Sequence, residues 1–222
     1  FDEVRVLCYL RRQDTMALSF YTQKLRGGFI PPSILPIHSV RRYRPRPPPF
    51  FDYESLLARW STAFGATSVQ PLVYERSELI DGYVIPDFFS RIGCPYPGDE
   101  KRETLNTSYN AAGQLALLTF NRVHAGDAAA RERSESRRLL LDRFLQREAP
   151  GKAMLPSREE AEEFNAAFTD SNRRVAEQWF DRQELFSAPG PDYPVQDTEP
   201  NWKAASWLLA KFAATMGDSE SW

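Results

Sequence analysis

Apolar residues form two short continuous runs and several longer stretches with helical spacing. The first run, VLCYL at residues 6–10, contains no charged residue and is typical of a strand buried on both faces of a parallel sheet. The second run lies in SVQPLVYER, residues 68–76, where Pro71 favours an edge strand or an irregular start. Helical patterns follow both runs, so the pattern predicts a βα order.

Caps and glycines delimit the helices that follow the strands. Asp14 and Asp52 are suited to cap two of them, and Gly27-Gly28 and Gly65 to end them. Their apolar faces are predicted to comprise Leu18, Tyr21 and Leu25 in the first helix, Leu56, Leu57, Trp60 and Phe64 in the second, and Val84, Ile85, Phe88, Phe89 and Ile92 in a third. We expect the stripe of the second helix to lie in the core.

The remainder of the chain is predicted to be helical from Asn110 onward. Apolar stripes recur around residues 115–118, 139–145, 161–179 and 202–216, and Ser157 with Glu160 forms a capping box. We therefore divide the chain into an α/β core, residues 1–94, and a helical portion packing on it, residues 95–222.

Composition excludes several classes of protein. The net charge of the 222 residues is −2, which gives no global sign of a nucleic-acid or membrane partner. Cys8 and Cys94 make neither a disulfide framework nor a metal cluster, and the residues present require no metal. No apolar run approaches the roughly 20 residues of a membrane span, and no signal peptide opens the chain. We expect a cytoplasmic protein, and the scarcity of lysine relative to arginine suggests a bacterial one.

Two arginines stand where the first strand passes into its helix. Ligands of open α/β sheets bind at the carboxyl ends of the strands, and a helix N-terminus attracts anions. The guanidinium groups of Arg11 and Arg12 match phosphate oxygens, and Ser19 adds a hydroxyl donor. The junction predicts a phosphate pocket, the alternative being arginines and a serine that are simply solvated.

The stretch RRQDTMALS, with Arg11 and Ser19 eight residues apart, resembles the 3′-phosphate signature of the sulfotransferases that use PAPS, 3′-phosphoadenosine 5′-phosphosulfate. The likeness to bacterial sulfotransferase-like proteins continues through FDYESLLARWSTAFG, LVYERSELIDGYVIPDFFSRIG and FTDSNRRVAEQWF, and so covers most of the chain. It implies an α/β fold, with a three-layer parallel sheet of the P-loop type and a helical C-terminal portion. It also implies that Arg11 and Ser19 bind the 3′-phosphate, assisted by Arg12.

Two parts of the family's donor site are missing from the sequence. No GxxxxGK[ST] or GxGxxG loop occurs to grip the 5′-phosphosulfate, and the family's catalytic base would also precede Phe1. The catalytic residues are therefore unknown. We expect an upstream segment or a partner chain to complete the site, and no turnover without it.

Two further segments are candidates for ligand contacts. Residues 29–51 are rich in proline, and their arginines Arg41, Arg42 and Arg44 are suited to an acidic or sugar acceptor, unless the segment is a solvated insertion. In GDEKRETLNTSYN, Lys101, Arg102, Asn106 and Ser108 are suited to the 3′-phosphate, although Asn106 or Ser108 could instead cap the following helix.

The resemblance implies transfer of a sulfuryl group from PAPS to a hydroxyl or amine, with a carbohydrate as the expected acceptor. Two alternatives stay open. A kinase-like transferase would bind ATP in the same crevice, and would need a Walker-type loop and an acidic metal ligand. A non-catalytic module would keep the anion pocket for binding a glycan or a partner.

Overall fold

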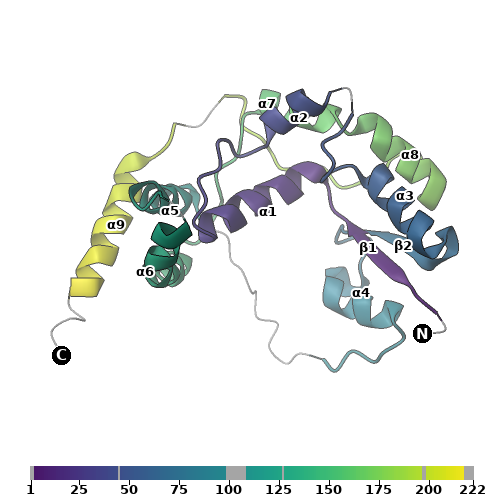
Figure 1. Ribbon diagram of the computed structural model, residues 1–222, viewed down its shortest axis with the longest axis horizontal. Coiled ribbons are helices and arrows are strands. Elements are labelled where there is room, and N and C mark those ends of the chain that lie inside the picture. Colours follow the sequence, from purple (N-terminus) through teal and green to yellow (C-terminus); the bar gives the residue numbers. More distant parts are fainter. Residues whose placement is uncertain (1–2, 45, 99–108, 127, 197–198, 218–222) are drawn as a thin grey trace. The chain divides into compact units, whose positions relative to one another are not determined.

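A computed structural model describes residues 3–44, 46–98, 109–126, 128–196 and 199–217. Within these ranges the chain is mostly helical (Figure 1). The two strands are β1 (Val6–Leu10) and β2 (Val69–Val73), and the short 3-10 helices are η1 (Ala66–Ser68) and η2 (Ile80–Gly82). The α-helices are α1 (Gln13–Arg26), α2 (Ile37–Tyr43), α3 (Tyr53–Phe64), α4 (Val84–Arg91), α5 (Ala111–Val123), α6 (Ala128–Glu148), α7 (Arg158–Ala166), α8 (Thr169–Phe180) and α9 (Trp202–Gly217).

The chain divides into two compact units that are not contiguous in sequence. The first unit comprises residues 1–16, 36–102 and 159–192, and it holds both strands. The second unit comprises residues 17–35, 103–158 and 193–222. Helix α1 begins in the first unit and continues in the second, so the boundary cuts one continuous helix.

The two strands pair in parallel, with Val6 opposite Val69 and Leu10 opposite Val73. The amide of Tyr74 donates to the carbonyl of Leu10 at 2.8 Å, which fixes the hydrogen-bonding register. Along a strand, the backbone N–H and C=O groups of successive residues point alternately to one edge and to the other. Gln70 and Leu72 therefore bond toward β1, and the backbone of Pro71 faces the outer edge of β2. Proline has no N–H to donate, so the edge position expected for Pro71 is confirmed.

The expected fold class is wrong. The described residues form a helix-rich structure with a two-stranded parallel sheet, instead of the three-layer parallel sheet of a P-loop or sulfotransferase fold. The residues themselves predicted only the two strands that are observed, at 6–10 and 69–73. The wider sheet came from the family resemblance, and no other described segment forms a strand to build it.

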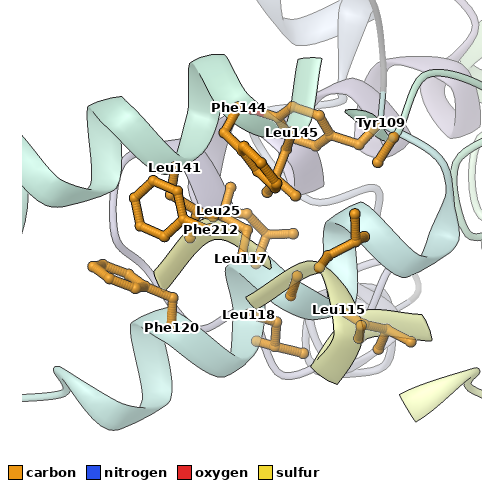
Figure 2. Close-up of a cluster of buried hydrophobic side chains, with 14 of the residues drawn as sticks. Leu25, Tyr109, Leu115, Leu117, Leu118, Phe120, Leu141, Phe144, Leu145 and Phe212 are labelled. Atoms are coloured by element: carbon orange, nitrogen blue, oxygen red, sulfur yellow. The ribbon is translucent and has the colours of Figure 1, made fainter. Parts of the chain in front are cut away.

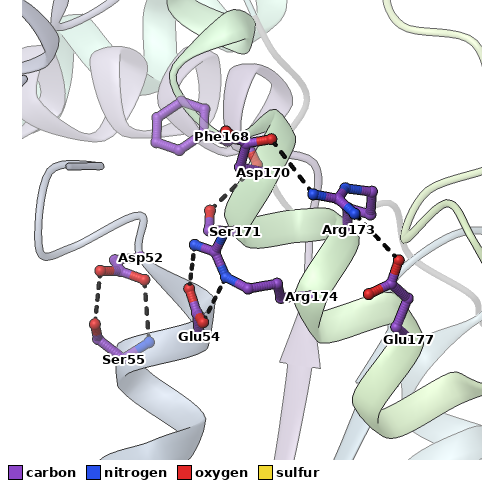
Figure 3. A network of polar contacts seen from close by, with 9 residues as sticks. All are labelled: Asp52, Glu54, Ser55, Phe168, Asp170, Ser171, Arg173, Arg174 and Glu177. Carbon is purple, nitrogen blue, oxygen red and sulfur yellow. Dashed lines mark hydrogen bonds and ion pairs between the residues drawn. The ribbon is translucent and has the colours of Figure 1, made fainter. Parts of the chain in front are cut away.

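In the first unit, the core lies between the sheet and helices α3 and α8. Leu10, Val69 and Val73 contribute from the strands, Tyr53 and Leu57 from α3, and Val175 and Ala176 from α8. A bidentate ion pair, 2.7 Å for both contacts, joins Arg174 on α8 to Glu54 on α3 (Figure 3). Asp52 caps α3 by accepting from the Ser55 amide at 3.0 Å, as the sequence predicted.

In the second unit, the core joins α1, α5, α6 and α9 (Figure 2). Leu25, Leu117, Leu141 and Leu145 are fully buried there. The polar side chain of Asn121 is buried beside them, and its amide donates to the carbonyls of Leu25 and Phe29 at 2.8 and 3.0 Å. A buried amide must find such partners, and these two bonds tie α5 to the end of α1.

Two predicted apolar stripes are only partly buried. Leu57 of α3 is inaccessible, but Trp60 and Phe64 are 39% and 42% exposed, so the expectation that the whole stripe lies in the core is wrong. On α4, Ile85 and Phe88 are 53% and 41% exposed. Helical spacing identifies the apolar face of a helix, but that face is buried only where another segment of the protein packs against it.

Candidate functional site

The candidate site lies at the carboxyl ends of the paired strands, within the first unit. Arg11 and Arg12 follow β1 directly, and α1 begins at Gln13 without an intervening loop. Tyr74 and Glu75 follow β2 at the same end of the sheet, because the strands are parallel. The structure thus brings two of the predicted site residues to the position that their sequence context indicated.

Arg12 is engaged by a buried carboxylate. Its Nε and one terminal nitrogen donate to the two oxygens of Asp14 at 3.0 and 2.8 Å, and Asp14 is completely buried. Asp14 also accepts from the Thr15 amide at 2.7 Å and from the Asn165 side chain at 3.1 Å. Because an unpaired buried charge is costly, Arg12 compensates Asp14, a structural role that the sequence did not reveal.

Arg11 lies beside an aromatic ring at the end of β2. Its guanidinium carbon is 5.6 Å from the ring centroid of Tyr74, and its Nε donates to the Thr15 hydroxyl at 3.2 Å. The Tyr53 hydroxyl donates to the Arg11 carbonyl at 2.5 Å, and burial raises the pKa of Tyr53. Neutral Tyr53 therefore fixes the backbone at the strand end, and the ring of Tyr74 orients the cation.

None of the other predicted phosphate ligands is among the described residues of the first unit. Ser19 lies on the part of α1 that belongs to the second unit, whereas Arg11 belongs to the first. Lys101, Arg102, Asn106 and Ser108 fall outside the described residues. The cap of the following helix, α5, is Asn110, whose side chain accepts from the Gly113 amide at 3.0 Å.

The arginines predicted to contact an acceptor belong to or follow helix α2. Arg41 donates to Glu163 on α7 through two nitrogens, at 3.1 and 2.8 Å, and Arg44 reaches the same carboxylate at 2.9 Å. These bonds hold the pKa of Glu163 below its ordinary value and that of Arg41 above it. Arg42 lies 5.9 Å from the ring centroid of Tyr43. The arrangement connects α2 to α7, and the acceptor role stays a prediction.

Glu75 binds the loop that follows α8. One of its oxygens accepts from the amide and hydroxyl of Ser187 at 3.1 and 2.9 Å, and from the amide of Ala188 at 3.1 Å. These donors are backbone and hydroxyl groups, with no cation among them. Its second oxygen, Oε1, is buried without a hydrogen bond from any described residue.

A cavity of about 400 Å³ runs along β2, and no pattern in the sequence predicted it. All five residues of the strand line it, together with Glu78, Leu79, Asp87, Arg91, Trp179 and Phe180. Asp87, almost completely buried, accepts from the Tyr9 hydroxyl at 2.7 Å and pairs with Arg91 at 3.4 Å. Burial would raise the pKa of Asp87, but the bonds from Tyr9 and Arg91 outweigh it and lower that pKa.

Neither a metal cluster nor a membrane span occurs in the described part of the chain. No group of three or more histidine, cysteine, aspartate or glutamate side chains is placed to hold a metal there. The helices within the same residues are too short or too polar to cross a bilayer. The two thiols are free, with Cys8 half-buried and Cys94 exposed.

Comparison with known proteins gives little further guidance. No family model and no solved structure matches the chain. An uncharacterized protein of Archaeoglobus fulgidus is 26% identical over 183 residues, which cover 82% of this chain and 47% of the relative. The chain thus spans about half the length of the curated relative it matches, and its function must be argued from its own residues.

Proposed function

We propose that the carboxyl ends of β1 and β2 bind a phosphate-bearing nucleotide. The first candidate is PAPS, and its reaction would be sulfuryl transfer to a hydroxyl or amine. The expected acceptor is a carbohydrate. The observation that supports this is the placement of Arg11 and Arg12 between a parallel strand and the N-terminus of α1. The proposal rests on this junction and on the RRQDTMALS signature, and it does not depend on a sulfotransferase fold.

The two arginines would contribute unequally. Arg11 lies beside the ring of Tyr74 and donates to the Thr15 hydroxyl, at the end of β1 where the predicted signature places the 3′-phosphate. Arg12 already compensates Asp14, and its side chain is 28% exposed. We therefore expect Arg11 to supply most of the binding free energy, with Arg12 mainly shaping the site. A phosphate held by a guanidinium gains charge-assisted hydrogen bonds.

The chain alone is expected to bind the nucleotide without turning it over. The sequence has no glycine-rich loop for the 5′-phosphosulfate, and none of its residues is assigned as a catalytic base. In sulfuryl transfer, as in phosphoryl transfer, positioning and charge stabilisation supply most of the rate enhancement. An additional segment or partner chain would have to provide those groups.

A second candidate function is a non-catalytic module that binds anions or a protein partner. The observation that favours a non-catalytic role is that Arg12, Arg41 and Arg44 all have carboxylate partners within the first unit, so these predicted donor and acceptor contacts are already engaged without a substrate. Arginines in such pairs stabilise structure and need no ligand. A kinase-like transferase remains the third candidate, and it differs from the first in preferring ATP.

Calorimetry with PAP, the spent donor, separates these functions. We expect micromolar affinity that Arg11→Ala and Ser19→Ala both weaken, with ATP binding more weakly. Arg173→Ala, which removes an exposed arginine of α8, is the matched control and should leave the affinity unchanged. Preference for ATP would indicate the kinase-like alternative. Absence of binding to either nucleotide by the folded chain would refute the nucleotide site and favour the binding module.

A further inference from the structure

The two strands differ in how well they are suited to an edge position. Each is an edge strand, because the described sheet has only two. Natural edge strands are protected by charged residues, proline or bulges, which prevent pairing with other chains. β2 has this protection in Pro71 on its outer edge, whereas β1, with the sequence VLCYL, has neither a charge nor a proline.

The outer edge of β1 presents backbone groups ready for another strand. The bond from Tyr74 to Leu10 shows that residues 6, 8 and 10 bond toward β2. The N–H and C=O groups of Leu7 and Tyr9 therefore point outward. No other described residue hydrogen-bonds to them. Their side chains, and those of Val6 and Cys8, are only half-buried.

Helix α4, which lies against β1, adds apolar surface to this part of the unit. The Tyr9 hydroxyl bonds to Asp87 on α4, and the Arg5 side chain donates to the Arg91 carbonyl at 3.3 Å. On the same helix and just beyond it, Ile85, Phe88 and Ile92 are exposed at positions i, i+3 and i+7, which share one face.

We propose that the outer edge of β1 is a docking site for an extended, apolar segment of a different protein, which adds to the sheet as a strand. Outward N–H and C=O groups at strand spacing, with no partner among the described residues, match an occupant with a complementary backbone, which a small molecule or a helix does not offer. The uncharged sequence of β1 favours an occupant with apolar side chains. This inference concerns an interaction surface, and it stands whether or not the carboxyl ends of the strands bind a nucleotide.

Hydrogen exchange measured residue by residue by NMR tests the site in the intact chain. In the free protein, the amides of Leu7 and Tyr9 should exchange much faster than that of Cys8, which bonds to β2. The probe is a nine-residue peptide of alternating valine and threonine, blocked at both ends. We expect it to slow the exchange of Leu7 and Tyr9 and to leave that of Cys8 unchanged. The matched control is the same peptide N-methylated at every residue, which has no N–H donor on either edge.

A substitution in the protein provides a second, independent test. Leu7→Pro removes an outward N–H that the β1–β2 ladder does not use, so circular dichroism should report an intact fold. The peptide should bind this variant roughly tenfold more weakly, the effect of losing about one hydrogen bond and its register.

Three results would overturn the proposal. The first is slow exchange of Leu7 and Tyr9 in the dilute, free protein, which would show that the edge is already covered. The second is equal binding of the unmodified peptide and of the fully N-methylated control, which would show that backbone pairing is not involved. The third is protection that rises with protein concentration alone, which would identify a second copy of this chain as the occupant.

Discussion

Gln13, at the start of α1, and Asn172, on α8, exchange two side-chain hydrogen bonds. The Gln13 amide donates to Asn172 at 2.7 Å, and the Asn172 amide donates back at 3.1 Å. The Gln13 side chain is only 2% exposed, so water cannot easily replace Asn172 as its hydrogen-bond partner. The pair fixes the residue that follows Arg11 and Arg12, and it therefore links the arrangement of the candidate site to the packing of α8.

Breaking this amide pair should destabilise the first unit. Asn172→Ala leaves the buried Gln13 side chain without its main partner, and we expect the free energy of unfolding to fall by about 1–3 kcal/mol. Urea denaturation followed by circular dichroism measures this change. The double variant Gln13→Leu with Asn172→Leu should lose less free energy of unfolding than Gln13→Leu and Asn172→Leu lose in sum when made singly, because both polar groups are then removed. Strict additivity would show that the pair is not coupled.

The ion pair between Arg12 and Asp14 should be worth more to stability than to ligand binding. Arg12→Ala leaves the buried carboxylate of Asp14 without its cation, and we expect a loss of about 3 kcal/mol in the free energy of unfolding. Arg12→Ala combined with Asp14→Asn should recover part of that loss. Chemical denaturation of the three proteins provides the measurement. If Arg12→Ala were as stable as the parent chain, the structural role of Arg12 would be contradicted, and Arg12 would be assigned to ligand binding instead.

Gly113, in the first turn of α5, lacks room for a side chain. A Cβ at this position would lie 2.8 Å from the Cβ of Tyr109 and 3.1 Å from that of Ala149. Alanine normally stabilises a helix by about 1 kcal/mol relative to glycine, but here we expect Gly113→Ala to destabilise the chain by about 1–3 kcal/mol. The melting temperature reports the sign directly. Ala112→Gly, one residue earlier, is the control, and it should show the ordinary cost of glycine.

Local sequence signals predicted the local structure well. The run VLCYL, the Asp52 cap and Pro71 all specify a backbone conformation through their own chemistry, and the structure contains each feature where expected. The number of strands and the exposure of Trp60 and Phe64 depend on which other segments reach them. Such contacts between distant segments leave no local pattern, and the family resemblance led to too large a sheet.

The candidate site shows the same limit. The sequence placed Arg11 and Arg12 at the strand end correctly, because the transition from strand to helix is local. It did not predict the pairing of Arg12 with Asp14, because it assigned Asp14 to a helix cap. It did not predict that Glu163 would bind Arg41, because the two residues are 122 positions apart. The cavity along β2 was also missed. It is formed by β2 with residues of α4, the next α-helix along the chain, and of α8, which is remote from both.

The pH dependence of stability should report the buried carboxylate of Asp87. Bonds from Tyr9 and Arg91 lower the pKa of Asp87, so the folded state favours the ionised form. A carboxyl group with a lowered folded pKa contributes stability above its unfolded pKa, about 4, and this contribution is lost as the pH falls through the folded value. Asp87→Asn should therefore be less stable than the parent chain at pH 7, with a difference that shrinks below about pH 5.

Urea denaturation at a series of pH values between 7 and 3 measures this effect. Tyr9→Phe, which removes one donor to Asp87, should reduce the acid-dependent loss without abolishing it. Glu177→Gln on the exposed face of α8 is the control, and its stability should follow the parent curve closely. A constant difference between Asp87→Asn and the parent at every pH would show that the carboxylate has no linked titration. The bonds from Tyr9 and Arg91 would then act only through packing.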